Sequence, residues 1–215
     1  MAAQDGTAHI VATPHANDHY HYDRNYLSRL LQDLQRRIGN TIELSLGCDL
    51  HLSFENMQNA FEAPQQYCIG DTRYLLIEFS NFSIPQQIDD WIDQMLERGT
   101  VPIITHPERN PLLQQNQERV LEWVNLGCGV QVTASALTGS WGTRAQQAAQ
   151  WLFKKKAVHI LASDGHDTVR RPPVLSEASR IVANEFGVDT AQTLLERNPG
   201  VVIRNGLPPW RHAGT

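Results

Sequence analysis

The sequence has 215 residues, of which 19% are charged, and a formal net charge of −5. This length suits one domain with a sizeable core, and the negative charge argues against nucleic-acid binding. No apolar run approaches the roughly 18–20 residues of a membrane span. The only basic run, residues 154–156, is interpreted as the solvated end of a helix.

Two further features concern the cellular compartment. Residues 1–9 have neither a basic start nor an apolar core, so we expect no signal peptide. The cysteines, Cys48, Cys68 and Cys128, are odd in number and lack metal-type spacing. Both features predict a cytoplasmic protein in a reducing environment.

The chain opens with what resembles the last turn of a helix, residues 1–6, and a strand follows at Ala8–Thr13. Most α/β domains open with a strand, so this order indicates that a first unit is missing. His15 directly follows the strand and is a candidate metal ligand. His19 and His21 form an H-x-H pair within a polar loop, where nothing preorganises them, and we interpret them as rim residues.

The next unit is a helix, a strand and an acidic residue. Tyr26–Ile38 has an apolar stripe at helical spacing that we expect to pack on the core. Ile42–Leu46 alternates as a strand does, and Asp49 follows it. Asp49 is a candidate metal ligand or, alternatively, the cap of a helix at 54–61. His51 is a candidate for supporting a metal ligand.

Tyr74–Ile77 is apolar on both faces, as expected of a buried parallel strand. Glu78 therefore emerges from the core, where a carboxylate costs several kcal/mol unless it is paired or binds a cation. That cost favours Glu78 as a metal ligand. A helix is expected at Pro85–Arg98, with Gly99 at its end. The residues expected to face inward from this helix are Ile88, Trp91, Ile92, Met95 and Leu96.

Val101–Asn110 is the most informative stretch, because a buried strand ends abruptly in polar residues. His106 is a candidate metal ligand at that strand end. Glu108 is interpreted as a carboxylate in the first turn of the next helix, favoured by the helix dipole. Arg109 can hold a phosphate group through two parallel hydrogen bonds.

The last strand with polar residues at its end is Val158–Ala162. Asp164 and His166 are alternate residues of the extended segment that follows, so both can reach one ion cluster. Arg171 lies in a stiff Pro-rich loop at the rim. The other expected elements are a strand at Gly129–Thr133 and helices at Gln117–Leu126, Trp141–Lys155, Ser176–Phe186 and Thr190–Arg197.

These elements predict an α/β fold with six strands, most of them followed by a helix. One candidate ligand per strand end favours a barrel, because ligands of an open sheet cluster at one switch point. We expect one domain over residues 1–206 and a loose C-terminal tail over residues 207–215.

The candidate ligands are nitrogen and oxygen donors without cysteine. Such a set suits Mn²⁺, Zn²⁺ or Fe²⁺, with two or three ions close together. These clusters activate water and neutralise charge on a phosphoryl group. Together with Arg109 and Arg171, the set predicts metal-assisted hydrolysis of a phosphate ester.

Five segments carry a resemblance to a known family, collinear over about residues 1–205. They resemble motifs of the PHP superfamily, in particular of the bacterial capsule and exopolysaccharide tyrosine phosphatases. The resemblance implies a distorted, TIM-like, seven-stranded α/β barrel with a trinuclear, usually manganese, centre. It also implies hydrolysis of phosphotyrosine on an autophosphorylating tyrosine kinase of polysaccharide export. The segments are Ala12–His15, Leu76–Phe79, Thr105–Arg109, Ala162–His166 and Arg171–Pro173.

The resemblance also assigns roles by position. Asp49 stands where the family usually has Glu, a longer carboxylate. Arg109 and Arg171 match the phosphate-binding, catalytic arginines. The residues that match metal ligands are His15, Glu78, His106, Asp164 and His166.

One departure from the family pattern is large. The family begins with a strand that carries an Asp-Ile-His-x-His-type motif, followed by a loop and a helix. This chain starts inside that helix, so we expect a barrel without its first strand and most of its first helix, and a metal site short of two ligands. An internal start codon or a truncated relative would explain this, and either reading puts the activity of the chain in question.

The residues exclude one alternative function, a cysteine-dependent phosphatase, and leave two others open. A cysteine-dependent tyrosine phosphatase needs an Arg six positions after its Cys, where this chain has Phe54, Tyr74 and Ala134. A different PHP phosphoesterase, acting on a small phosphate monoester such as histidinol phosphate or a nucleotide, would share every ligand. A non-catalytic degenerate barrel could serve as a binding module, a reading that the missing first unit favours.

Overall fold

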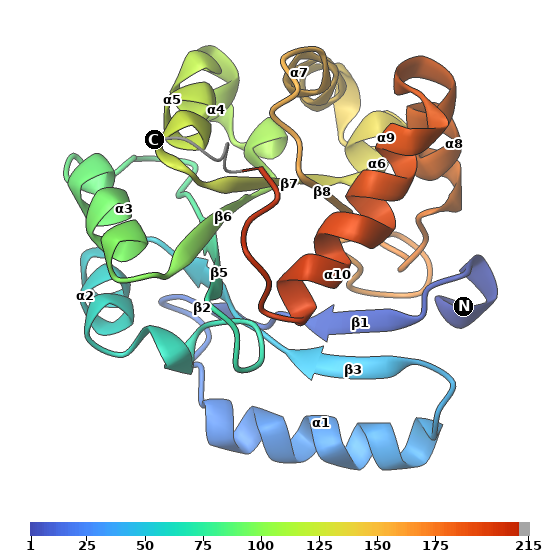
Figure 1. The fold of residues 1–215 in the computed structure, drawn as a ribbon, viewed down its shortest axis with the longest axis horizontal. Coiled ribbons are helices and arrows are strands. Elements are labelled where there is room, and N and C mark those ends of the chain that lie inside the picture. The colour runs from blue at the N-terminus through green and yellow to red at the C-terminus, as the bar shows by residue number, and fades with distance from the viewer. Residues whose placement is uncertain (211–215) are drawn as a thin grey trace.

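The computed structural model describes residues 1–210. Parallel strands form a curved layer, and helices cover its outside (Figure 1). The strands of the described residues are β1 (His9–Ala12), β2 (His15–Ala16), β3 (Glu43–Leu46), β4 (Asp49–His51), β5 (Tyr74–Glu78), β6 (Val101–Thr105), β7 (Gly129–Thr133) and β8 (Ile160–Ala162).

The helices vary from one turn to four. The α-helices are α1 (Arg24–Ile38), α2 (Phe54–Glu62), α3 (Ile88–Glu97), α4 (Pro111–Gln115), α5 (Glu118–Leu126), α6 (Ala134–Leu137), α7 (Gly142–Lys154), α8 (Ser176–Phe186), α9 (Val188–Gln192) and α10 (Asn198–Ile203). Short 3-10 helices lie at Ala3–Asp5, Pro64–Gln66 and Pro107–Arg109, and Thr193–Arg197 is a π-helix. Among the described residues, every helix is too short or too polar to cross a membrane.

Two of the expected strands, found as β1 and β3, are each followed by a further short strand that was not predicted, β2 and β4. β1 pairs with β3, and β2, after a short break, pairs with β4. The ladder continues across the break, because the Gly47 N–H donates to the Ala12 carbonyl at 2.8 Å. A Cβ at Gly47 would lie 3.1 Å from Ile69 and 3.2 Å from Val11, so glycine permits this close approach.

The larger sheet has the strand order β2-β4-β5-β6-β7-β8, and every pair in it is parallel. Because consecutive strands are neighbours and helices connect most of them, the α/β class predicted from the sequence is confirmed. Within the described residues, β1 and β8 each pair with a strand on one side only. The six-stranded sheet has β2 and β8 at its edges, and β1, which precedes β2 in the chain and pairs with β3, extends the β2 edge.

The core lies between the strands and the outer helices. All residues of β6 and β7 are buried, including the polar residues Gln131 and Thr133 of β7. The inward face of α3 is also buried, as its spacing predicted: Ile88, Trp91, Ile92, Met95 and Leu96.

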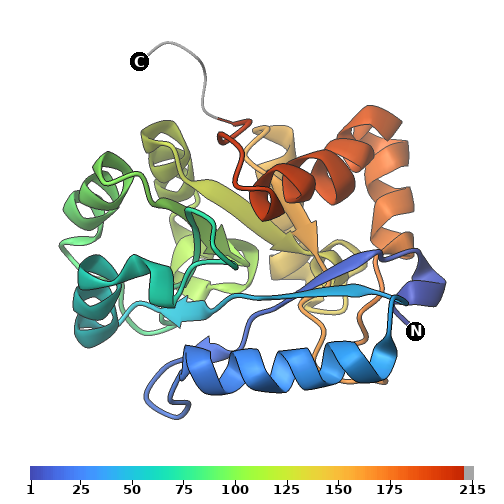
Figure 2. The ribbon, with the colours of Figure 1, turned by 60° about the horizontal axis from the view of Figure 1, so that its bottom comes forward.

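The helix α1 departs from the prediction. The expected core stripe is partly exposed, since Tyr26 is 53% exposed and Leu30 and Leu34 are each 47% exposed. α1 lies along the two-stranded β1–β3 ribbon, at the margin of the fold (Figure 2). The prediction of full core packing is therefore wrong, because α1 lies beside two strands at the margin of the fold and none of its residues is buried.

The expected C-terminal tail lies only partly within the described residues. Trp210 packs against Tyr74 and His159, with ring centroids 5.9 and 5.0 Å apart. Its Nε1 also donates to the Gly127 carbonyl at 3.2 Å. Residues 211–215, the rest of that expected tail, lie outside the described part of the chain.

Candidate metal centre

Three side chains from three neighbouring strands converge at one place on the sheet. His15 begins β2, Asp49 begins β4 and Glu78 ends β5. Each offers one ligand atom, and these atoms all lie within 4.8 Å of one another. His15 Nδ1 is 3.4 Å from Glu78 Oε2 and 3.6 Å from Asp49 Oδ2. The strand register thus gathers two carboxylates around one imidazole.

His106 completes this group from the end of β6. Its Nε2 lies 3.5 Å from Asp49 Oδ2 and 3.5 Å from Glu78 Oε1. The backbone of His106 is left-handed, with φ 36°, a conformation that costs a non-glycine residue roughly 1–3 kcal/mol. Its N–H is held by the Gln131 carbonyl at 2.8 Å. This turn directs the imidazole back over the sheet.

Thr105 supports the cluster, a role that the sequence analysis missed. Its Oγ1 donates to Asp49 Oδ1 at 2.9 Å, and both residues are buried. The only local signal was its position as the last residue of a buried strand, next to His106. Asp49 does not cap α2, because Ser53 accepts a hydrogen bond from the Asn56 N–H there. The capping alternative for Asp49 is therefore wrong.

The cluster is strongly coupled electrostatically. Burial alone would raise the pKa of Glu78, but the contacts with His15 and His51 hold that pKa well below its usual range. The paired Glu78 carboxylate in turn raises the pKa of His15 against the opposing effect of burial, and it does the same for His51, whose Nδ1 lies 3.7 Å away. Ionised carboxylates in a half-buried site favour a bound cation.

The donors present fit a divalent ion. His15 Nδ1 is buried, yet it has no hydrogen-bond partner among the described residues. Its carboxylate neighbours lie at 3.4 and 3.6 Å, a spacing that leaves room for an ion roughly 2 Å from each donor. An orphaned imidazole nitrogen between two carboxylates is the pattern of a metal ligand rather than of a packed core histidine.

Two arginines meet beside this cluster. Arg109 Nη1 and Arg171 Nη2 both donate to Oδ2 of Asp164. Asp164 follows β8 in a left-handed conformation, with φ 49°. His166 Nδ1 lies 3.6 Å from Asp164 Oδ1, and its ring centroid is 6.2 Å from that of His15. Positive charge therefore gathers next to the carboxylate cluster.

Other polar residues singled out in the sequence lie elsewhere. Glu108 is 1% exposed and accepts a hydrogen bond from the Thr133 N–H at 2.9 Å, and burial raises its pKa. Glu108 does lie in the first turn of the next helix, the 3-10 helix Pro107–Arg109, as interpreted from the sequence, but its side chain is buried. His19 and His21 are exposed and outside the cluster, whereas Tyr20 between them stacks on the His15 ring at 6.4 Å.

The comparisons with known proteins agree with this geometry. A family profile described as "Capsular polysaccharide synthesis, CpsB/CapC" matches residues 1–204. The chain belongs to the CpsB/CapC family. This result confirms the resemblance to the capsule-type phosphatases at the level of the family.

Several CpsB/CapC relatives carry a functional name. The chain is 26% identical to the tyrosine-protein phosphatase CpsB of Streptococcus pneumoniae, over 82% of this chain and 74% of that protein. It is 28% identical to the tyrosine-protein phosphatase YwqE of Bacillus subtilis, over 95% of this chain and 81% of YwqE. It is 30% identical to the putative tyrosine-protein phosphatase CapC of Staphylococcus aureus, over 82% of this chain and 71% of CapC.

The fold is also similar to a solved CpsB/CapC structure. A chain from the crystal structures of YwqE and CpsB, described as unique metal-dependent tyrosine phosphatases, superposes with a TM-score of 0.87. The two chains are 26% identical, over 95% of this chain and 84% of the solved one. The solved relative is thus described as metal-dependent, and this chain has a His/Asp/Glu cluster that could hold a metal ion.

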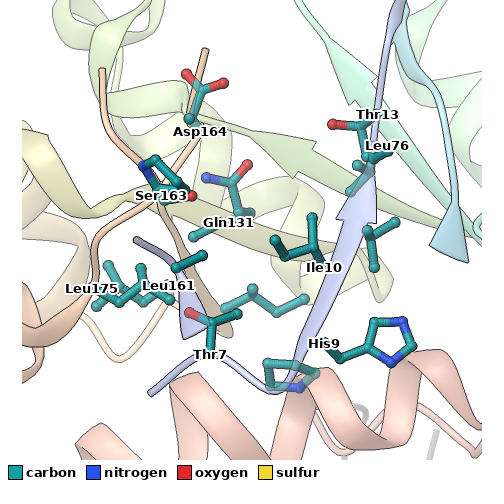
Figure 3. A pocket seen from close by; sticks show the side chains of 18 of the residues that line it. Thr7, His9, Ile10, Thr13, Leu76, Gln131, Leu161, Ser163, Asp164 and Leu175 are labelled. Carbon is teal, nitrogen blue, oxygen red and sulfur yellow. The ribbon is translucent and has the colours of Figure 1, made fainter. Parts of the chain in front are cut away.

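A cavity of about 1460 Å³ adjoins the candidate metal centre. Ile10 of β1 and Leu161 of β8 line it from opposite edges of the strand layer, and Asp164 lies at one end (Figure 3). His15 and His106 also border it. The open side of this CpsB/CapC chain thus leads directly to the candidate metal centre.

Proposed function

We propose that this chain is a metal-dependent protein-tyrosine phosphatase. Its proposed substrate is a phosphotyrosine protein, such as an autophosphorylating bacterial tyrosine kinase of polysaccharide export. The observation that carries the proposal is a His/Asp/Glu cluster beside two arginines that share one oxygen of Asp164, with Arg109 and Glu78 lining the same small cavity. The names of the CpsB, YwqE and CapC relatives support the substrate class.

The proposed metal site uses the residues that meet at the strand ends. Asp49 and Glu78 each lie near both His15 and His106, so in our proposal these four side chains would hold the ions together. When bound, two or three divalent ions, in our proposal Mn²⁺ with Zn²⁺ or Fe²⁺ as alternatives, supply Lewis acidity to a phosphoryl group and to water. The proposed ligands are His15, Asp49, Glu78, His106, Asp164 and His166.

Arg109 and Arg171 are the proposed catalytic residues that bind the phosphoryl group. A guanidinium presents a planar fork of N–H donors that matches phosphate oxygens and remains charged at any working pH. Because both arginines reach one oxygen of Asp164, an anion near that point can accept from both. Charge that develops on the phosphoryl oxygens then meets donors that are already in place.

The cysteines support a mechanism without a thiol nucleophile. Cys48 and Cys68 are buried, and burial raises the pKa of the Cys48 thiol strongly and that of Cys68 to about 12. A thiol of such high pKa is a poor nucleophile near neutral pH. We also propose that the protein acts in the cytoplasm, where thiols stay reduced.

We further propose that the fold is a distorted, seven-position PHP barrel in which the described residues leave one strand position unfilled. The supporting observation is the cavity between the two strand edges, β1 and β8. A strand placed there would run between Ile10 and Leu161 and end beside Asp164 (Figure 3). Such a strand could bring further ligands to the metal centre.

The test is phosphate release from a phosphotyrosine peptide, measured with Mn²⁺ and after chelation. It compares this chain with one preceded by a single βα unit taken from YwqE. We expect manganese-dependent release, and release only by the extended chain would mean that the filled strand position is required. Faster turnover of small phosphate monoesters would favour a different PHP phosphoesterase. If neither chain binds metal or hydrolyses the peptide, the non-catalytic binding module is the remaining alternative.

A further inference from the structure

Trp141 lies where the two arginines meet. The Cζ atom of Arg109 is 3.7 Å from the centroid of the Trp141 ring, and that of Arg171 is 5.2 Å away. A guanidinium within about 6 Å of an indole face is attracted by the ring electrons. We propose that Trp141 is a positioning residue that holds both guanidiniums in the orientation that binds phosphate. The inference rests on the phosphatase function proposed above.

The indole is itself fixed in place. Its Nε1 donates to Ser135 Oγ at 2.9 Å, which ties the ring to α6. Gly142 follows with φ 82°, a left-handed conformation that favours glycine, and α7 begins there. Trp141 is 37% exposed, so one part of the ring is anchored and another part borders open space. A ring held in this way can serve as a platform.

The same ring also borders the metal cluster. Trp141 lines a small cavity of about 140 Å³ together with Arg109, Glu78 and His106. A group that enters from this side therefore meets the indole, a guanidinium and two proposed metal ligands. Trp141 therefore lies between the arginines and the cluster, but its ring is not one of the proposed metal ligands.

The indole contact complements the carboxylate contact. Asp164 is the acceptor that Arg109 and Arg171 share, and it is also a proposed metal ligand. An oxygen that binds a metal has less hydrogen-bonding capacity left for arginine. The Trp141 contact uses no oxygen, so it holds the guanidiniums whatever Asp164 binds.

Arg109 has few other constraints on its side chain. Its Nε atom is buried and has no hydrogen-bond partner among the described residues. The guanidinium is therefore oriented by Asp164 at one end and by the face of Trp141 along its plane. Removing the indole should leave Arg109 with more rotamers and a weaker grip on phosphate.

The test measures the affinity of the manganese-loaded chain for inorganic phosphate by calorimetry, together with kcat and KM for a phosphotyrosine peptide. Trp141→Leu keeps an apolar side chain but removes the ring, whereas Trp141→Phe keeps a ring. We expect Trp141→Leu to weaken phosphate binding about tenfold and to raise KM, with manganese content and Tm unchanged. Trp141→Phe should recover most of the affinity.

A matched control uses a cation–π pair far from the site. The Arg98 guanidinium lies 3.6 Å from the ring centroid of Phe61, and Phe61→Leu should leave phosphate affinity at the wild-type value. In an Arg109→Ala background, Trp141→Leu should weaken phosphate binding much less than in the wild type, because the two residues act as a unit.

Three results would overturn the inference: wild-type phosphate affinity in Trp141→Leu, loss of manganese or a lowered Tm in that variant, or a wild-type chain that binds no phosphate. The proposed function fails separately. If the wild type binds phosphate but does not hydrolyse phosphotyrosine, the phosphatase assignment is lost, and the role of Trp141 is still decided by phosphate affinity.

Discussion

His15 and Asp49 are register partners in the parallel ladder between β2 and β4, and His15 Nδ1 lies 3.6 Å from Asp49 Oδ2. The same kind of pairing places His51 opposite Glu78 between β4 and β5. Parallel pairing brings strand ends from distant parts of the chain to one edge. The candidate metal centre is therefore a consequence of strand register, and the first three predictions below test contacts in it or beside it.

His106→Ala should remove manganese from one position and reduce kcat/KM by about three orders of magnitude. The reason is that His106 contacts both carboxylates of the cluster and that metal charge stabilisation is worth several kcal/mol. Metal content by mass spectrometry and phosphate release from a phosphotyrosine peptide check this. The matched control is His19→Ala, in the exposed loop, which should keep normal turnover. Near-normal turnover in His106→Ala would refute the assignment of His106 to the metal site.

Arg109→Ala should keep its manganese but lose turnover about a hundredfold or more, since a preorganised donor to transition-state charge is removed. Arg171→Ala should behave in the same way, because both guanidiniums reach the same oxygen of Asp164. Arg170→Ala is the control, as Arg170 is an exposed neighbour in the same loop. Loss of metal from Arg109→Ala would mean that its role is structural.

Thr105→Val should weaken manganese binding about tenfold, in line with the effect of other residues that orient metal ligands. The hydroxyl of Thr105 donates to Asp49 Oδ1, and without that bond the carboxylate can rotate away. Thr190→Val is the comparison, because the Thr190 hydroxyl donates to the Phe186 carbonyl away from the cluster. Equal manganese affinity in Thr105→Val and the wild type would show that Thr105 does not orient Asp49.

Stability should fall at mildly acidic pH because of His159. Burial lowers the pKa of His159 from 6.5 to about 4, so the folded chain binds the proton less well than the unfolded chain. The stabilising contribution is complete above pH 6.5 and is lost as the pH falls toward 4, up to about 3 kcal/mol by linkage.

The measurement is the free energy of unfolding in urea at pH 7.5 and pH 5. His159→Asn cannot protonate, so its stability should change less between the two pH values than that of the wild type. His19→Asn controls for the loss of a histidine from an exposed loop. An equal pH dependence in His159→Asn and the wild type would show that His159 does not cause the loss.

The sequence by itself determined the elements and the residues at their ends. Buried parallel strands are short apolar runs, so the strands before Glu78 and His106 could be recognised without knowing their neighbours. The helix α3 buried the five residues that its spacing predicted. These are local patterns, and local sequence suffices to find them.

The tertiary structure decided which other residues each of these polar side chains contacts. Asp49 could be a cap or part of a cluster until Ser53 was seen to cap α2. The apolar stripe of α1 indicated a buried face. The helical spacing of apolar residues does not show, however, whether other elements of the fold cover that face. The contacts of Thr105 with Asp49 and of Trp141 with Arg109 join residues 56 and 32 positions apart. Such contacts depend on how strands pair and helices pack, and no single stretch of sequence contains that information.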